Sequence, residues 1–73
     1  MFGISEEALQ KIKTEFLAGC RVQLVSMNDL YTRIDPGTQG TVIGIDDIGT
    51  IHVSWDSGST LGVVFGEDSC KKI

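Results

Sequence analysis

The spacing of apolar residues changes once along the chain, near Gly19. Before it, apolar residues recur every three or four positions, which is the spacing of one helical face. Ser5 is suited to cap the start of such a helix, because its hydroxyl can accept a free backbone N–H. We therefore expect a helix over residues 4–18, ended by Gly19 as its C′ residue. Its apolar stripe comprises Ala8, Leu9, Ile12, Phe16 and Leu17.

After Gly19 the apolar residues alternate with polar ones, a period typical of half-buried strands. In the clearest example Ile51, Val53 and Trp55 share one face, and the polar residues between them face the other way. Gly44 predicts a bulge or bend, since closing a small sheet requires one. The predicted strands cover residues 20–27, 40–45, 50–56, 60–65 and 70–73.

These patterns predict a mainly β fold, a small five-stranded antiparallel barrel with an N-terminal α-helix. We divide the chain into an amphipathic helix, residues 1–19, and a β-barrel, residues 20–73. The turns between the strands have suitable residues: Pro36-Gly37 fits a type II turn, and Gly58 fits the left-handed position of a hairpin. The helix is too short to be stable alone. Its stripe is expected to pack either on its own barrel or on a partner such as a second copy.

The composition of the chain argues against some classes of function. The chain has 73 residues, 10 acidic and 6 basic, and a net charge of −4. The basic residues are scattered, which argues against general binding to a phosphate backbone, although a local patch stays open. The first residues lack the pattern of a secretory signal, and no apolar run is long enough to span a membrane. We expect a cytoplasmic protein that does not bind membranes.

Two cysteines and one histidine provide little for a metal or a cofactor, and we expect neither. Cys20 and Cys70 fall in the first and last predicted strands. They are expected as free thiols, buried or half-buried, and a disulfide between them stays open as the alternative.

Few residues suggest catalysis, and we expect no enzymatic activity. His52 has serine and aspartate neighbours, but an exposed strand face has no pocket to exclude water or to hold an oxyanion. We expect a solvated histidine in cross-strand contacts. Asp46 and Asp47 are expected to hydrogen-bond their own turn rather than to bind a cation. Glu67 and Asp68 are expected to cap a single turn or to form part of an acidic surface.

Several motifs resemble a known family. The segments "RV.L..M.D", "PGT.GTV", "DD.GTIHV.WD.GS.L" and "GED", between about Gly19 and Lys72, resemble short bacterial and phage proteins catalogued as domain of unknown function 4314. The resemblance implies an SH3-like barrel, often carried by phages or mobile elements, and no assigned activity. The chain is more loosely similar to KOW modules and ubiquitin-ligase barrels, which bind RNA or peptides. It lacks the basic loop of the RNA-binding members.

SH3-like barrels commonly bind ligands between their long first loop and the neighbouring strand ends. That loop here spans residues 28–36, and "LYTRI" within it is more apolar than a turn requires. Aromatic and arginine side chains often anchor interfaces. We therefore predict a partner-binding surface of Tyr31, Arg33 and Asp35 with Trp55 beside them. Alternation also allows Trp55 to lie in the core.

The leading hypothesis is a non-catalytic interaction module that binds a protein partner through the 28–36 loop and the barrel rim. A phage or mobile-element role rests only on the resemblance. The first alternative is a nucleic-acid-binding barrel of the KOW type. It requires one patch formed by Arg21, Arg33, Lys71 and Lys72. The further alternative is an oligomeric scaffold, joined through the helix, or a small-ligand binder.

Overall fold

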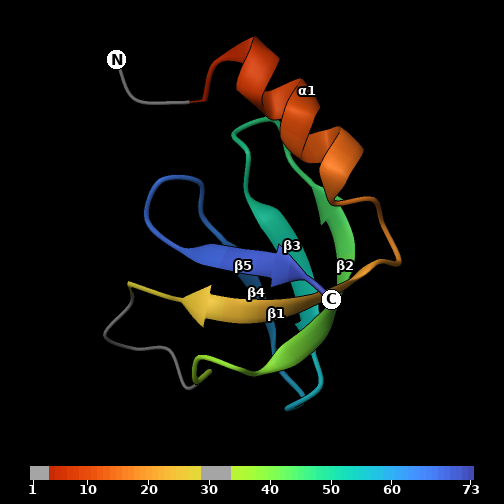
Figure 1. Cartoon of the computed structure of the whole chain (residues 1–73), viewed down its shortest axis with the longest axis vertical. Coiled ribbons are helices and arrows are strands. Elements are labelled where there is room, and N and C mark those ends of the chain that lie inside the picture. The colour runs from red at the N-terminus through yellow and green to blue at the C-terminus, as the bar shows by residue number, and fades with distance from the viewer. Residues whose placement is uncertain (1–3, 29–33) are drawn as a thin grey trace.

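The computed structural model of the chain describes residues 4–28 and 34–73. It contains one α-helix and a five-stranded antiparallel sheet in the order β4-β3-β2-β1-β5 (Figure 1). The predicted helix and mainly β fold are therefore confirmed. The elements are α1 (Glu6–Glu15), β1 (Arg21–Ser26), β2 (Gln39–Ile45), β3 (Ile51–Trp55), β4 (Thr60–Val63) and β5 (Ser69–Lys72).

Helix α1 begins as predicted and ends earlier. The Ser5 hydroxyl accepts the Ala8 N–H at 3.1 Å, which confirms the N-cap. Phe16 is the C-cap residue, with a non-helical backbone at φ −108° and ψ 70°, and its side chain packs against the core. Gly19 is therefore not the C′ residue. Its φ of 95° leads the chain toward β1, and its N–H donates to the Val42 carbonyl at 2.7 Å.

The helix packs on its own sheet. Ile12 and Phe16 contact the core, and Lys13 Nζ lies 3.9 Å from Asp47 Oδ1 in the turn between β2 and β3. Figure 1 shows α1 across one end of the sheet, next to that turn. Leu17, at the end of the predicted stripe, is 63% exposed because the helix ends before it.

The core consists of side chains from the inner face of the sheet and one loop residue. Ile51, Val53 and Trp55 are buried, and the two residues between them are exposed, as the alternation predicts. Ile34 is only 5% exposed, so this apolar residue of the 28–36 loop belongs to the core and not to a contact surface. The buried apolar residues are Val22, Leu24, Ile34, Val42, Ile51, Val53, Trp55 and Val63.

Glycine shapes the sheet at the predicted places. Gly37 has φ 95°, and the Thr38 N–H donates to the Asp35 carbonyl at 3.1 Å, which are the features of a type II turn. The register of β2 against β3 shifts between Val42 and Gly44, which is the predicted bulge.

The predicted closure into a barrel is incomplete. The sheet order ends at β4 and β5, and no ladder joins these edge strands within residues 4–28 and 34–73. After β4 the chain passes through the turn at residues 64–68 and pairs with β1. Figure 1 shows β1 and β5 running crosswise to β3, so the sheet is strongly bent but open at one seam.

Gly40 allows β2 to approach the core closely, and this makes a test of the packing. A Cβ at Gly40 would lie 2.6 Å from Val53 Cγ1 and 2.9 Å from Trp55 Cε3. We expect Gly40→Ala to lower the free energy of unfolding by about 1–3 kcal/mol, since overpacking forces its neighbours to shift. Urea unfolding measures the change.

The matched control is Gly44→Ala in the same strand. A Cβ there meets nothing within 4 Å, and the residue does not have a positive φ. We expect it to be neutral or slightly stabilising, because alanine restricts the unfolded chain. Equal destabilisation by the two substitutions would contradict the packing account.

Candidate functional site

An apolar pocket of about 230 Å³ lies at the open seam of the sheet. Helix α1 forms one wall, and the end of β4 with the start of β5 forms the other. The pocket exists because the two edge strands diverge and α1 covers only part of the space between them. Its lining residues are Ile12, Phe16, Gly49, Ile51, Val63, Phe65, Gly66, Asp68, Ser69 and Cys70.

The turn at residues 64–68 borders this pocket and is held by Asp68. One carboxylate oxygen of Asp68 accepts the Val64 N–H at 2.9 Å, and the other accepts the Asn28 N–H at 2.8 Å. The first of the two expected roles, capping a turn, is therefore confirmed for Asp68. The second contact also ties the start of the 28–36 loop to the border of the pocket.

Phe65 stands at the rim of the pocket. It is 48% exposed although it lines an apolar cavity. Val64 beside it is also exposed. Large apolar side chains that remain at the surface beside a cavity are typical of sites where a partner binds.

The predicted partner-binding residues are not assembled as a group by the described part of the chain. Tyr31 and Arg33 lie outside the described residues. Asp35 is exposed at the start of the type II turn. Trp55 is 2% exposed, and its indole N–H donates to the Leu61 carbonyl at 3.0 Å, so it belongs to the core and not to the rim.

The sequence pattern does not predict the pocket. Phe65 falls at the end of a predicted strand, but β4 stops at Val63 and the next residues turn away. The one available indication was the apolar run Val63–Phe65, since consecutive apolar residues do not fit a strand with one solvated face.

Both cysteines are free and half-buried, as expected, and Cys70 lines the pocket. Burial raises the pKa of the Cys70 thiol to about 11, and the nearby Cys20 and Glu15 add to the effect. The thiolate is the nucleophilic form, so Cys70 is an unreactive apolar group near neutral pH.

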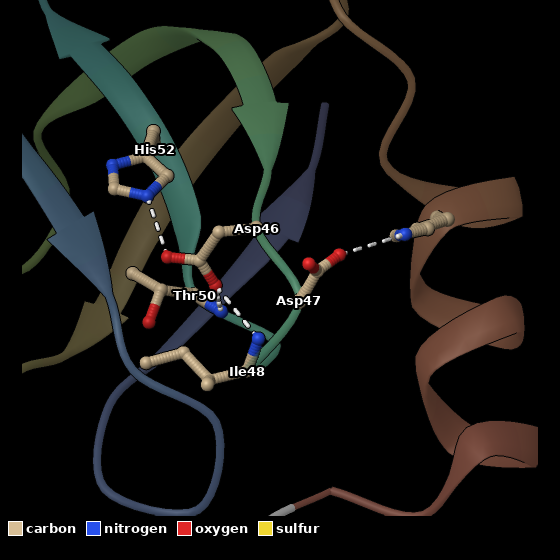
Figure 2. A network of polar contacts seen from close by, with 6 residues as sticks. Asp46, Asp47, Ile48, Thr50 and His52 are labelled. Atoms are coloured by element: carbon tan, nitrogen blue, oxygen red, sulfur yellow. Dashed lines mark hydrogen bonds and ion pairs between the residues drawn. The ribbon is translucent and has the colours of Figure 1, made fainter.

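His52 and Asp46 form a polar network at the turn between β2 and β3 (Figure 2). His52 Nε2 lies 2.9 Å from one oxygen of Asp46, and the other oxygen accepts the N–H groups of Ile48 at 3.1 Å and Thr50 at 2.9 Å. These bonds, led by that with His52, hold the Asp46 pKa below its ordinary value. Asp46 therefore has the predicted turn role. His52 lies on an exposed strand face, as predicted, but its contact is with this turn residue and not with a neighbouring strand.

A second polar contact crosses the outer face of the sheet. The Arg21 guanidinium donates at 2.9 Å to Thr41 Oγ1 and at 2.9 Å to Asp56 Oδ1, and its other terminal nitrogen reaches Asp56 Oδ2. The hydrogen bond from Arg21 holds the Asp56 pKa below its ordinary value. Arg21 is thus engaged with a carboxylate of its own chain.

Two further features are absent from the described residues. Within residues 4–28 and 34–73, no group of three or more potential metal-ligating side chains is found. In the same part of the chain, no helix has the length and apolar character that crossing a membrane requires.

The model of one protein family matches residues 5–73, and its description is Domain of unknown function (DUF4314). The chain belongs to the DUF4314 family. The resemblance seen in the sequence motifs is confirmed, and the match extends beyond those motifs to include the helix that packs on the sheet. Comparison with curated proteins and with solved structures found no match.

The Asp46 network predicts a specific response to acid. Because the folded protein lowers the Asp46 pKa, this carboxylate stabilises the fold above its unfolded pKa, and that stability is lost as pH falls through the folded value. We expect Asp46→Asn to be less stable at neutral pH and to lose less further stability below about pH 4. Thermal unfolding at several pH values measures both effects.

The control is Asp47→Asn, which removes the neighbouring carboxylate. Asp47 is fully exposed, and its described contact is the 3.9 Å ion pair with Lys13. We expect its pH dependence to stay close to that of the unmodified protein. The same flattening in both variants would contradict a specific role for Asp46.

The pocket environment predicts how Cys70 reacts. In a Cys20→Ser background, we expect the iodoacetamide alkylation rate of Cys70 to rise about tenfold per pH unit from about pH 7, without a plateau before about pH 10. The reason is the pKa of about 11. The same protein unfolded in urea should level off near the ordinary cysteine pKa of about 8.5. A plateau at that lower pH in the folded protein would contradict the burial of the thiol.

Proposed function

We propose that this DUF4314 chain is a non-catalytic module that binds a protein partner. The proposed surface, here called the seam surface, consists of the apolar pocket, the turn at residues 64–68 and the 28–36 loop. The observation that carries the proposal is the open apolar pocket with Phe65 exposed at its rim. Burying such a surface in an interface is favourable because it removes apolar area from water.

The size of the pocket favours a side chain over a free small molecule. Its volume of about 230 Å³ is below the roughly 300–1,000 Å³ of small-molecule sites. One large apolar side chain fits such a volume, and interfaces are commonly anchored by single aromatic or aliphatic groups in pockets of this kind.

The 28–36 loop begins at the same surface. Asp68, which lines the pocket, accepts the Asn28 N–H at 2.8 Å. A partner seated at the pocket therefore lies next to the first residue of the loop. This contiguity supports combining the loop predicted from the sequence with the pocket.

The nucleic-acid alternative has less support. Arg21 forms a two-pronged pair with Asp56, which neutralises one of the four basic residues that the alternative requires. In the ladder between β1 and β5, Lys71 lies opposite Gln23, and Lys72 lies opposite Val22. Adjacent strand residues point to opposite faces, so the two lysines do not extend a single basic patch.

The proposal is tested by affinity capture from a lysate followed by mass spectrometry. We expect Tyr31→Ala/Arg33→Ala to reduce recovery of the captured partner at least about tenfold without lowering the melting temperature, as truncation of interface anchors does. The control is Gln10→Ala/Lys11→Ala on the exposed side of α1, which should retain capture. Capture that persists in the Tyr31/Arg33 variant would reject the 28–36 loop as part of the proposed surface.

A further inference from the structure

Within residues 4–28 and 34–73, the outer edge of β4 pairs with no other strand, and its last residue, Val63, lines the pocket. Just before β4, the Ser59 carbonyl accepts the N–H of Trp55 in β3 at 2.8 Å, and the register places Leu61 of β4 opposite Val53. Backbone groups of an antiparallel strand point alternately to one neighbour and to the other. Residues 59, 61 and 63 therefore bond to β3, and Thr60 and Gly62 direct their N–H and carbonyl groups outward.

The turn at residues 64–68 closes only one end of that edge. The Val64 N–H donates to Asp68 Oδ2 at 2.9 Å, and the Val64 carbonyl accepts the N–H groups of Glu67 and Asp68. Thr60 and Gly62 make no such contact with the described part of the chain. An edge of this kind is a template for an added strand.

The surroundings of the pocket are acidic. Asp68 lines it, Glu67 lies in the turn, and Glu15 on α1 is near enough to raise the Cys70 pKa. Lys13, the basic residue in the last turn of α1, is directed to Asp47. A segment that enters the pocket therefore meets negative charge, which favours flanking lysine or arginine side chains.

We propose, on the basis of the proposed function, that the partner contributes an extended segment that adds to the free edge of β4 at Thr60 and Gly62. The segment places one large apolar side chain in the pocket, with lysine or arginine two residues away on either side, where the side chains share the same face. The edge sets the direction and register through main-chain hydrogen bonds, and the pocket selects the side chain. The acidic residues around the pocket, here called the acidic rim, are Glu15, Glu67 and Asp68. They disfavour segments that carry acidic residues at these neighbouring positions.

The first test uses three blocked peptides at millimolar concentration. The probe is acetyl-Lys-Thr-Phe-Thr-Lys-amide, in which both lysines share a strand face with the phenylalanine, and the controls replace both lysines by glutamate or the phenylalanine by alanine. We expect the probe to slow alkylation of Cys70 in the Cys20→Ser protein at least about fivefold and to shift the amide resonances of Thr60 and Gly62. Equal effects from the three peptides, or no protection by the probe, would overturn the proposal.

Strand addition also predicts an alternation within the probe. Two versions are N-methylated on alternate backbone amides, so that only one version blocks the N–H groups that face β4. We expect the version that blocks the N–H groups facing β4 to bind at least about tenfold more weakly than the unmodified probe. The other version should bind like the probe. Loss of binding in both versions, or in neither, would overturn strand pairing.

Two charge-reversal variants on α1 test whether the carboxylates around the pocket set the preference between the peptides. Glu15→Lys should reverse the preference between the lysine-flanked and glutamate-flanked peptides, and Glu7→Lys, near the start of the helix, should leave it unchanged. An unchanged preference in Glu15→Lys would reject the role of the acidic rim.

The outcomes separate this inference from the proposed function. If the peptides fail but the Tyr31/Arg33 variant loses a captured partner, the strand-addition inference is rejected and the interaction module stands. If the probe binds as expected but capture does not depend on Tyr31 and Arg33, the loop is rejected and the pocket stands.

Discussion

The contact between the Trp55 ring and the backbone at Gly40 is the constraint on which the rest of the structure depends. A side chain at Gly40 would overlap both Trp55 and Val53, so β2 and β3 come together only because this residue has none. The large indole then fills the centre of a small core, and its N–H is satisfied by Leu61. A domain of this size has a small core, so a single well-packed aromatic side chain contributes a large share of the apolar surface that is buried on folding.

The same packing explains the open seam. The bulge at Gly44 and the corners between strands bend the sheet, but β5 pairs with β1, and no strand of the described residues pairs with the outer edge of β4. Helix α1 covers one end of the resulting gap with Ile12 and Phe16. The pocket is therefore a consequence of incomplete closure, and it is apolar because the walls belong to the inner face of the sheet and the inner stripe of the helix.

Charged side chains act locally in this protein. Asp46 and Asp68 each use one carboxylate oxygen to hold a turn and the other to contact a different segment, at His52 and at Asn28 respectively. Asp56 holds Arg21 across the sheet. These contacts occupy the groups that invite a catalytic interpretation in the sequence, including His52. The proposed binding role is supported instead by an apolar side chain, Phe65, that stays exposed at the rim of an apolar pocket.

The sequence by itself determined the elements and their inward faces. Alternation placed Ile51, Val53 and Trp55 inside, and glycine marked the bulge and the corners, because these features depend on neighbours a few positions away. The tertiary structure alone decided that α1 stops at Glu15, that Ile34 joins the core, and that β4 and β5 do not pair. The candidate site depends on these features of the tertiary structure. Its walls come from segments far apart in the chain, and local periodicity carries no information about the distance between them.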